Sequence, residues 1–461
     1  METLAGTDYV VIVAYLVGVV ALGLWAGHRA QQDTLSDFFL GGKKLPWWLL
    51  GTSMVATTLA ADTPLAVAGL TIGKGVAGNW FWWSAAISHV LVSVALARLW
   101  RRANVVTDAE LCSVRYQGRS AGILRGLKAF YMAVPINCIT MGWVFLAMAK
   151  VGAAVLPEFE SWQIIGGLLG LTLLYSVRSG FSGVVITDLV QFPLALLGTV
   201  VLAFYAVREA GGVNAVVQAA VDRGGAEAID LFPMGGELLP WHTLFAFLGI
   251  QWWAQKYSDG GGLIVQRMLA AKSERDAELG GLWFCFAHYI LRPWPWILTG
   301  MAAIALLPPE QVNADPEGTY PILMMQVLPV GVRGLLVATF LAAFMSTIDT
   351  HLNWGASYIA NDLVGQWVEL PPERIPLVSR LSVMGIAILA VGISLMMESI
   401  TGAWEFILAL GAGSGAAVLL RWYWWRITAE AEIAAMVASS LFAIIAYTLG
   451  ADWPYLQKLT L

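Results

Sequence analysis

Hydroxyl and carboxyl side chains are concentrated in one part of an otherwise apolar segment, residues 341–353, which reads LAAFMSTIDTHLN. On a helical period, one face carries the positions i, i+3, i+4 and i+7, which are Ala343, Ser346, Thr347 and Thr350. Asp349 flanks that face. Hydroxyl and carboxylate oxygens are hard ligands that suit a small hard cation better than a soft metal. Because an ionisable side chain at membrane depth is costly, Asp349 indicates function, and the segment predicts a sodium site.

The composition indicates an integral membrane protein. Of the 461 residues, 58% are hydrophobic and only 12% are charged. A soluble protein with so few charges could not cover its surface, whereas a protein embedded in lipid needs no such cover. The bilayer then dictates an all-α architecture, because every backbone polar group must be satisfied within a helix. About twelve transmembrane helices are expected, over 8–28, 46–72, 77–99, 121–155, 161–178, 183–206, 240–265, 278–306, 331–361, 376–398, 402–421 and 432–449.

The placement of charge predicts an orientation. Basic residues cluster after the first, third, fifth and seventh expected spans, at Arg29, Lys43, Lys44, Arg98, Arg101, Arg102, Arg115, Arg119, Arg178, Arg267, Lys272 and Arg275. Loops on the other side are acidic, as at Glu158 and Glu317. The positive-inside rule therefore places the basic loops in the cytoplasm and the N-terminus on the outer side. The expected location is the cell membrane, that is, the plasma or inner membrane. The first span has no basic leader and no cleavage site, so we expect it to be a retained helix.

Several function classes are disfavoured by what the sequence lacks. It has no Walker-type glycine loop, which argues against an ATP-driven pump and favours an ion gradient as the energy source. Its three cysteines have neither a disulfide pattern nor metal-ligand spacing. No nucleophile–base pair or metal triad stands out, so we expect no enzymatic activity, no cofactor apart from a coupling ion, and no nucleic-acid partner.

Two expected helices contain many polar and helix-breaking residues. The first, 46–72, contains Asp62 and Pro64, and the second, 240–265, contains three consecutive glycines from Gly260. Interrupted helices at corresponding places in two halves are typical of secondary transporters built from inverted repeats. Five spans counted from each give two repeats of similar length, about 46–206 and 240–421. The alternative is that the glycines only allow close helix packing.

Four motifs, in order along the chain, resemble the sodium:solute symporter family. They are Asp37–Leu45 with Trp47 and Trp48, Ser179–Gln191, Ile264–Ser273, and Ala343–Thr347. The likeness extends to members that carry galactose or proline. It implies a five-plus-five inverted-repeat (LeuT-type) core over 35–425, with broken first and sixth core helices. One extra helix would precede the core in 1–34, and one would follow it in 426–461.

The resemblance implies a main sodium site between the break in the first core helix and the eighth core helix. Matched by motif, its ligands are the backbone carbonyls of Ala56, Leu59 and Ala343 and the hydroxyls of Ser346 and Thr347. Unwound backbone offers carbonyls that an intact helix would keep in its own hydrogen bonds. The alternative is that both hydroxyls bond back to carbonyls of their own helix.

Some relatives have a second cation site, which the resemblance places here at Asp188, Ser346, Asp349 and Thr350. Asp349 stands where most relatives have a small or hydroxyl residue. The additional carboxylate could strengthen binding of a second sodium ion or could carry a proton. Alternatively, Asp188 pairs with a basic residue such as Arg178.

The solute pocket is implied by matching positions in the galactose-carrying relative. These are Asp62, Thr63, Phe81, Ser84, Gly261, His288 and Glu405. The amides and lysine that bind sugar there are mostly absent, and carboxylates beside indole rings suit an organic cation or the ammonium of a zwitterion. Arg292 could neutralise Asp62 or bind a solute carboxylate. Interfacial anchoring explains most of the 22 tryptophans and is the better explanation for any one of them, whereas His288 is as often a packing residue as a ligand.

We therefore expect a sodium-coupled symporter that imports a small organic solute by alternating access. A sugar is not the first choice, but the solute class stays open among an amino acid, a betaine or other organic cation, a sugar and a nucleoside. Two alternatives are a proton-coupled symporter that uses Asp188 and Asp349, and a sensor or channel-like protein with the same fold. The absence of any kinase or receiver module after the last helix lowers the sensor alternative.

Overall fold

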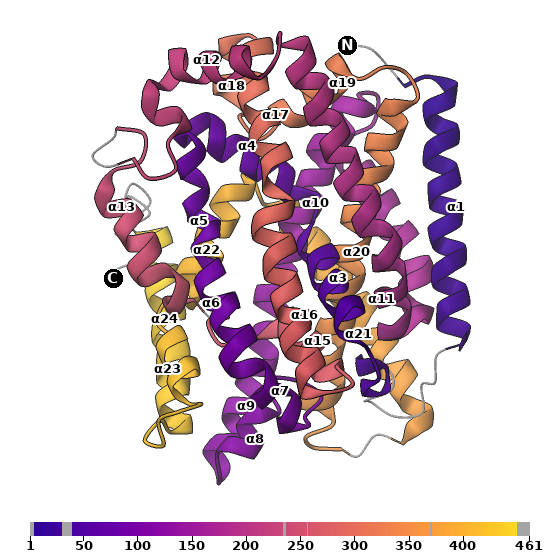
Figure 1. Ribbon diagram of the computed structural model, residues 1–461. Coiled ribbons are helices and arrows are strands. Elements are labelled where there is room, and N and C mark those ends of the chain that lie inside the picture. Colours follow the sequence, from indigo (N-terminus) through magenta and orange to yellow (C-terminus); the bar gives the residue numbers. More distant parts are fainter. Residues whose placement is uncertain (1–3, 30–38, 234–236, 256, 369–370, 450–461) are drawn as a thin grey trace.

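The computed structural model describes residues 4–29, 39–233, 237–255, 257–368 and 371–449, with the side chains at 24, 26–29, 174–180, 182 and 372 outside this description. Every regular element in these ranges is helical, and the longer helices run roughly side by side along one direction (Figure 1). The all-α prediction is thus confirmed. The first resemblance motif begins at Asp37, outside the described residues, so only its part from Phe39 onward can be followed.

Seven helical segments are long and apolar enough to cross a membrane, or eight if one bent pair is counted as a span. The seven are Gly6–Gly23, Val76–Ala103, Arg119–Val155, Gly183–Glu209, Val332–Val364, Ile375–Ser394 and Ala429–Thr448. Other expected spans are built from shorter helices that meet at breaks or π-helical turns, for example α16 (Glu274–Phe286), η7 (Ala287–Leu291) and α17 (Pro293–Leu306).

The first predicted break lies between α3 (Trp47–Thr58) and α4 (Asp62–Lys74). The two helices are bent by 61° relative to each other. Helical geometry is lost at Leu59, where φ is −96° and ψ is 69°. Ala60 and Ala61 complete the break, and Asp62 opens α4.

The second predicted break separates α14 (Trp252–Ala254) from α15 (Gly262–Ala270). Gly260 and Gly262 adopt positive φ values of 96° and 63°, which L side chains rarely adopt. Before the break, α13 (Trp241–Ala246) continues into the π-helical η6 (Phe247–Gln251). The glycine run therefore marks the break correctly.

One expected loop is absent. The prediction of separate spans 161–178 and 183–206 is wrong for the backbone, which forms one helix, α11 (Ser161–Glu209), of 49 residues. A straight helix of that length would measure about 74 Å, more than twice the hydrocarbon thickness of a bilayer. Only Gly183–Glu209 within it qualifies as a long apolar span. The stretch between the expected spans 183–206 and 240–265 is also partly helical, as α12 (Val213–Gly224).

The centre of the bundle is α20 (Val332–Tyr358), which contacts α1 (Gly6–Arg29), α3, α11 and α21 (Ile375–Ser394). Nearly all of its side chains are buried, including the hydroxyl and carboxyl groups of the opening segment. Asp8 of α1 caps its first turn: Asp8 Oδ1 accepts hydrogen bonds from the N–H groups of Gly331 and Gly334 at 2.8 and 2.7 Å. The extra N-terminal helix is therefore joined directly to the core.

The remaining helices surround this centre. They are η1 (Gly41–Lys43), η2 (Val76–Asn79), α5 (Trp80–Trp83), α6 (Ala85–Leu91), η3 (Val92–Leu96), α7 (Ala97–Ala103), α8 (Leu111–Arg115), α9 (Arg119–Tyr131), η4 (Met132–Ile136), α10 (Asn137–Val155), η5 (Ala226–Ile229), α18 (Pro309–Ala314), α19 (Thr319–Val327), η8 (Ile359–Val364), η9 (Pro372–Arg374), α22 (Ile400–Gly411), α23 (Gly415–Leu420) and α24 (Ala429–Thr448).

Candidate functional site

The hydroxyls of α20 face the end of α3. Ser346 Oγ donates to the carbonyl oxygen of Ala56 at 3.2 Å and lies at the same distance from the carbonyl oxygen of Ala343. These are three of the five predicted main-site residues. The contact with Ala343 means that the back-bonding alternative holds in part for Ser346.

Thr347 reaches the same helix end. Its hydroxyl donates to the carbonyl oxygen of Thr57 at 2.9 Å, across to α3 and not back to α20. Leu59 is the first residue of the break, and its N–H bonds to the carbonyl oxygen of Ala56 at 3.1 Å. Carbonyl and hydroxyl oxygens of α3 and α20 therefore converge, and a set of neutral oxygens suits a hard cation.

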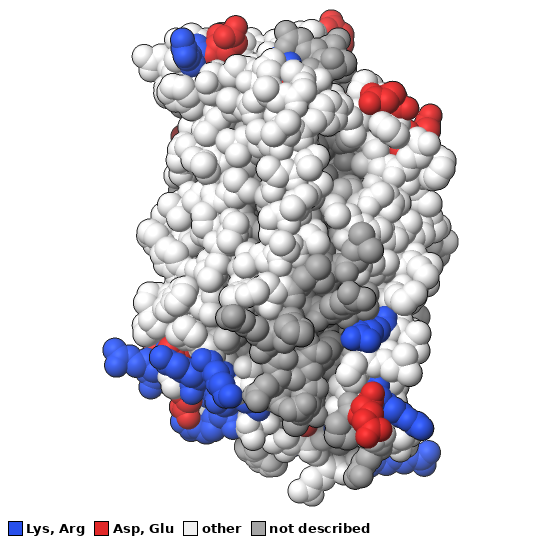
Figure 2. Space-filling view, turned by 90° about the vertical axis from the view of Figure 1, so that its right-hand side faces the viewer, with Lys and Arg blue, Asp and Glu red and all other residues white. Residues whose placement is uncertain are grey.

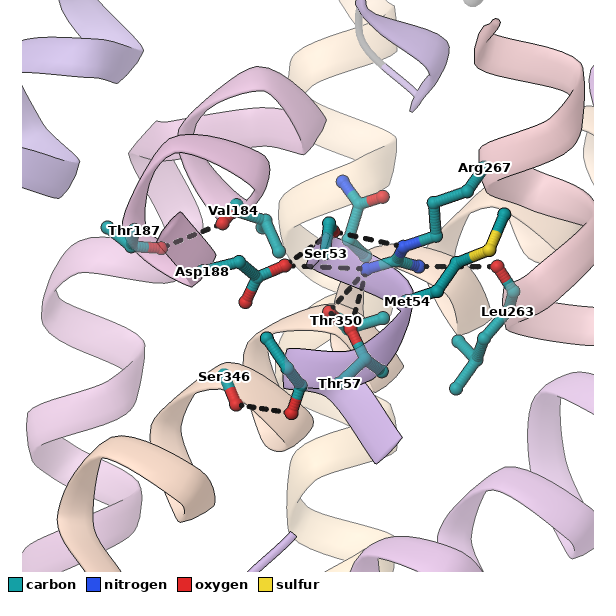
Figure 3. Close-up of polar contacts among 12 residues, drawn as sticks. Ser53, Met54, Thr57, Val184, Thr187, Asp188, Leu263, Arg267, Ser346 and Thr350 are labelled. Carbon is teal, nitrogen blue, oxygen red and sulfur yellow. Dashed lines mark hydrogen bonds and ion pairs between the residues drawn. The ribbon is translucent and has the colours of Figure 1, made fainter. Parts of the chain in front are cut away.

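The predicted second cation site contains an arginine (Figure 3). The guanidinium of Arg267, fully buried on α15, donates to the hydroxyls of Thr57 and Thr350, each at 2.8 Å. It also donates to Ser53 Oγ at 3.2 Å and lies 3.9 Å from the Asp188 carboxylate. Ser53 in turn donates to Asp188 at 2.5 Å.

This arrangement corrects two expectations from the sequence. Arg267 is not in a cytoplasmic loop, because it lies inside the bundle between α3, α11 and α20. Asp188 pairs with this arginine, while the side chain of Arg178 lies outside the described residues. Asp349, also buried, lies close enough for its charge to act on Arg267, whereas Ser346 turns to the main site.

A cavity of about 300 Å³ lies beside both broken helices. Its walls include the predicted solute residues Asp62, Thr63, Phe81, Ser84, Gly261 and His288. Thr57 and Thr347 also line it, so the cavity reaches the candidate sodium site. Six of the seven predicted solute positions are thus brought together around one space.

Glu405 is the exception, because it is not among the described residues that line the cavity. The preceding residue, Trp404, lines it instead, and its indole Nε1 donates to Asp62 Oδ2 at 3.1 Å. Neighbouring residues on a helix point in directions about 100° apart, which is enough for one to face the cavity and the next to face away from it. The aromatic wall also includes Trp82, Trp143 and Tyr289.

Asp62 contributes negative charge to the cavity. It is 2% exposed, and among the described residues its Oδ1 atom has no hydrogen-bond partner. It also sits in the first turn of α4, where the helix dipole stabilises negative charge. A buried carboxylate oxygen without a donor is well placed to accept a hydrogen bond from a solute.

Arg292 contributes positive charge, but its terminal nitrogens are already engaged. They contact the carbonyl of Val55 at 3.2 Å, the hydroxyl of Thr58 at 3.4 Å, and the ring of His288 at 2.6 Å. Because Val55 lies in the last turn of α3, the guanidinium stabilises the negative end of that helix. His288 lies in η7, and its Nδ1 contacts the Thr58 hydroxyl at 3.0 Å.

The second break is held by a buried ion network. Arg421 contacts Asp259 at 2.6 Å and Glu432 of α24 at 3.2 Å. Asp259 also accepts a hydrogen bond from the indole of Trp422 at 3.1 Å. The network therefore ties the unwound segment before α15 to the C-terminal part of the chain.

Sequence reasoning did not identify several of these groups. Gln251 donates to the hydroxyl of Ser84 at 3.1 Å within the cavity wall. Thr57 takes part in both the candidate sodium site, through its carbonyl, and the arginine cluster, through its hydroxyl. The sequence does contain a signal that Arg267 is buried and functional, because it closely follows the apolar residues 263–265 and an ionisable residue at membrane depth indicates function. The π-helical turn that carries His288 could be suspected from Pro293, which cannot donate to the preceding turn.

Comparisons with known proteins point to one family. A family model described as the sodium:solute symporter family matches residues 38–439. The sodium/glucose cotransporter of Vibrio parahaemolyticus is 26% identical over 98% of this chain and 87% of its own length. Sodium/glucose cotransporter 1 of Ovis aries is 28% identical over 77% of this chain. The aligned part covers only 58% of the length of that relative.

Solved structures show the same fold. A Na+-coupled sialic acid symporter, in a substrate-bound outward-open state, superposes with a TM-score of 0.78 at 19% identity, over 99% of this chain and 94% of that one. A nucleobase-cation-symport-1 family transporter gives 0.51 at 12% identity, over 90% and 95%. The expected LeuT-type transporter fold is thereby confirmed. Together with the family match over most of its length, this shows that the chain belongs to the sodium:solute symporter family.

Proposed function

We propose that this sodium-coupled symporter binds its driving sodium ion between the end of α3 and the middle of α20. The ligands would be the carbonyls of Ala56, Leu59 and Ala343 with the hydroxyls of Ser346 and Thr347. The observation that carries the proposal is the convergence of α3 carbonyls and α20 hydroxyls within 2.9–3.2 Å at a helix break. Sodium would replace these hydroxyl–carbonyl contacts and hold the two helices together.

Coupling follows from the position of Thr347. Its hydroxyl contacts α3, and the residue also lines the solute cavity, so one residue borders both binding sites. An ion that orders the break would also order the adjacent cavity wall at Thr57 and Thr58. Such coupling is reciprocal, because a solute that favours the ordered break must raise sodium affinity by the same factor. Alternating access would then open the loaded cavity to the other side of the membrane.

The solute that fits the cavity best carries an ammonium or another cationic group. Asp62 would bind that group through its Oδ1 atom, and the rings of Trp404 and Phe81 line the same space. Buried carboxylates and aromatic faces both favour cations. Arg292 acts on Asp62 only through its charge at a distance, since its terminal nitrogens are bound to the end of α3 and to His288.

A sugar is the second candidate, favoured by the sodium/glucose cotransporters among the relatives. Sugar hydroxyls can donate to Asp62, and the amide of Gln251 lies in the same wall. The surface that the wall presents to the cavity decides between the two. Hydroxyl and amide side chains such as Thr63 and Gln251 are present, but this surface is mainly apolar and Asp62 lies in it, and we therefore place the cationic solute first.

We further propose a cell-membrane location with the N-terminus outside. Lysines and arginines gather at the lower end of the molecule (Figure 2), where α7 carries Arg98, Arg101 and Arg102. The N-terminal end of α1 lies at the opposite, upper end (Figure 1). By the positive-inside rule, the lower end would face the cytoplasm.

A thermal-shift screen of the purified protein tests the solute proposal. Amines, betaines, amino acids, sugars and nucleosides are each added with sodium and with choline as the replacement cation. We expect an amine-containing compound to raise the unfolding midpoint in sodium and to have a smaller effect in choline. The hit is then followed as uptake into proteoliposomes driven by an inward sodium gradient.

The screen also distinguishes the competing proposals. Stabilisation by neutral sugars alone would contradict the cationic solute and support the second candidate. Stabilisation and uptake that do not depend on sodium, but follow a proton gradient, would contradict sodium coupling itself.

A further inference from the structure

A permanent positive charge occupies the place where the sequence predicts a second coupling ion. Arg267 is fully buried on α15 and contacts residues of α3 and α20, with Asp188 of α11 at 3.9 Å (Figure 3). An arginine guanidinium stays protonated in proteins, so this charge is present at every step of the transport cycle.

The guanidinium already uses the oxygens that a sodium ion would need. Its two hydroxyl contacts at 2.8 Å take up Thr57 and Thr350, and Thr350 is one of the four predicted ligands. Ser53 is used twice, as an acceptor from Arg267 and as a donor to Asp188. A sodium ion here would have to displace the arginine from these contacts.

Charge leads to the same result. Asp188 is the nearest carboxylate to Arg267, and the charge of Asp349 also acts on it. A sodium ion between these carboxylates would lie beside the guanidinium, and like charges at such distances repel strongly inside a protein, where screening is weak. The arginine therefore supplies the positive charge beside the two carboxylates that a second sodium ion would otherwise supply.

We propose that Arg267 is a built-in cation that replaces a second sodium ion, so that one sodium ion accompanies each solute molecule. The inference rests on the proposed function, because the remaining ion is the one bound at the main site by Ala56, Leu59, Ala343, Ser346 and Thr347. Thr57 connects the two centres: its hydroxyl binds Arg267 and Thr350, and its carbonyl accepts from Thr347.

The number of sodium ions bound per purified protein molecule tests this directly. Equilibrium dialysis against radiolabelled sodium gives the saturating ratio, and no solute is required. We expect one ion for the natural chain and for Arg267→Lys, which keeps the charge. Arg267→Gln removes the charge and frees Thr57 and Thr350, so we expect two ions. The double change Arg267→Gln with Asp188→Asn should return the ratio to one.

Matched changes separate this inference from the main site. Thr347→Ala should abolish the single ion, and Arg98→Gln, at an exposed arginine paired with Glu278, should leave the ratio at one. Two ions in the natural chain, with one lost in Thr347→Ala, would overturn the inference and leave the proposed main site standing. A ratio of one in Arg267→Gln would also overturn it. Absence of saturable binding in the natural chain would overturn both. If Arg267→Gln does not fold, the ratios of the natural chain and Arg267→Lys decide.

Discussion

The hydroxyl of Thr347 donates a hydrogen bond to the carbonyl oxygen of Thr57 at 2.9 Å, between the middle of α20 and the last turn of α3. Thr57 also presents its side-chain hydroxyl to Arg267 and Thr350. One residue next to the first break thus joins the candidate sodium site to the buried arginine. Both residues line the cavity as well, so the candidate ion site, the candidate solute cavity and the buried arginine meet within one turn of α3.

Asp62→Asn is expected to weaken binding of a cationic solute by at least about tenfold. The change removes the negative charge that a cation needs, and a hydrogen bond to a charged group contributes about 1.5–3 kcal/mol. Affinity for a neutral solute should fall less, because the amide can still accept a hydrogen bond. Titration of the thermal shift with the compound found in the screen gives both affinities.

Glu405→Gln is the matched control, since it makes the same chemical change one residue beyond Trp404 on α22. We expect little effect, because Glu405 is not among the described residues of the cavity wall. A large loss in Glu405→Gln together with a small one in Asp62→Asn would contradict the structural assignment of the pocket, and only Glu405 would remain of the two carboxylates that the resemblance places there.

Arg421→Gln is expected to destabilise the protein by about 3–5 kcal/mol, because it leaves the buried carboxylates of Asp259 and Glu432 without their cation. The measurement is the thermal unfolding midpoint of the purified protein, compared with that of the natural chain. Arg98→Gln, at a largely exposed ion pair, should cost less than about 1 kcal/mol. Equal midpoints for the two variants would show that the network does not hold the second break.

Asp8→Ala is expected to cost about 1–2 kcal/mol of stability, since it removes the acceptor that caps the first turn of α20. Asp8→Asn keeps an oxygen in the same place and should cost less. The two unfolding midpoints are compared under the same conditions. If neither variant differs from the natural chain, the contact between α1 and the core does not contribute to stability.

Much of this architecture could be predicted because its signals are local. The apolar runs indicate membrane helices, and glycines such as Gly260 and Gly262, which adopt positive φ, identify the second break. The residues of the main site could be matched by motif, and Ala56, Ala343 and Ser346 do meet. In these cases a short segment contains both the residue type and the backbone feature that matters.

Other features depended on where helices meet in space. Arg267 looked like part of a cytoplasmic basic cluster, because Lys272 and Arg275 follow closely, yet α15 turns it into the bundle toward Thr350. Trp404, and not Glu405, lines the cavity because the rotation of α22 is set by its neighbours. The loop expected after residue 178 is helical, although Gly180 and Gly183 lie in this stretch and glycines favour a loop. Long-range packing decided each of these cases.

Sodium affinity of Thr347→Ala is the most direct test of the main site. The natural chain and the variant are titrated with sodium at constant ionic strength, with choline as the replacement, and the thermal unfolding midpoint is followed. Loss of one ligand oxygen should raise the half-saturating sodium concentration about tenfold or more, which corresponds to about 1.4 kcal/mol. Ser346→Ala should act in the same direction.

Ser357→Ala is the control, because it removes a hydroxyl from the same helix that bonds back to Trp354 of α20. We expect the half-saturating sodium concentration to rise in Thr347→Ala and to stay at the natural value in Ser357→Ala. An unchanged sodium dependence in Thr347→Ala, in a variant that folds like the natural chain, would contradict the site on which the account rests.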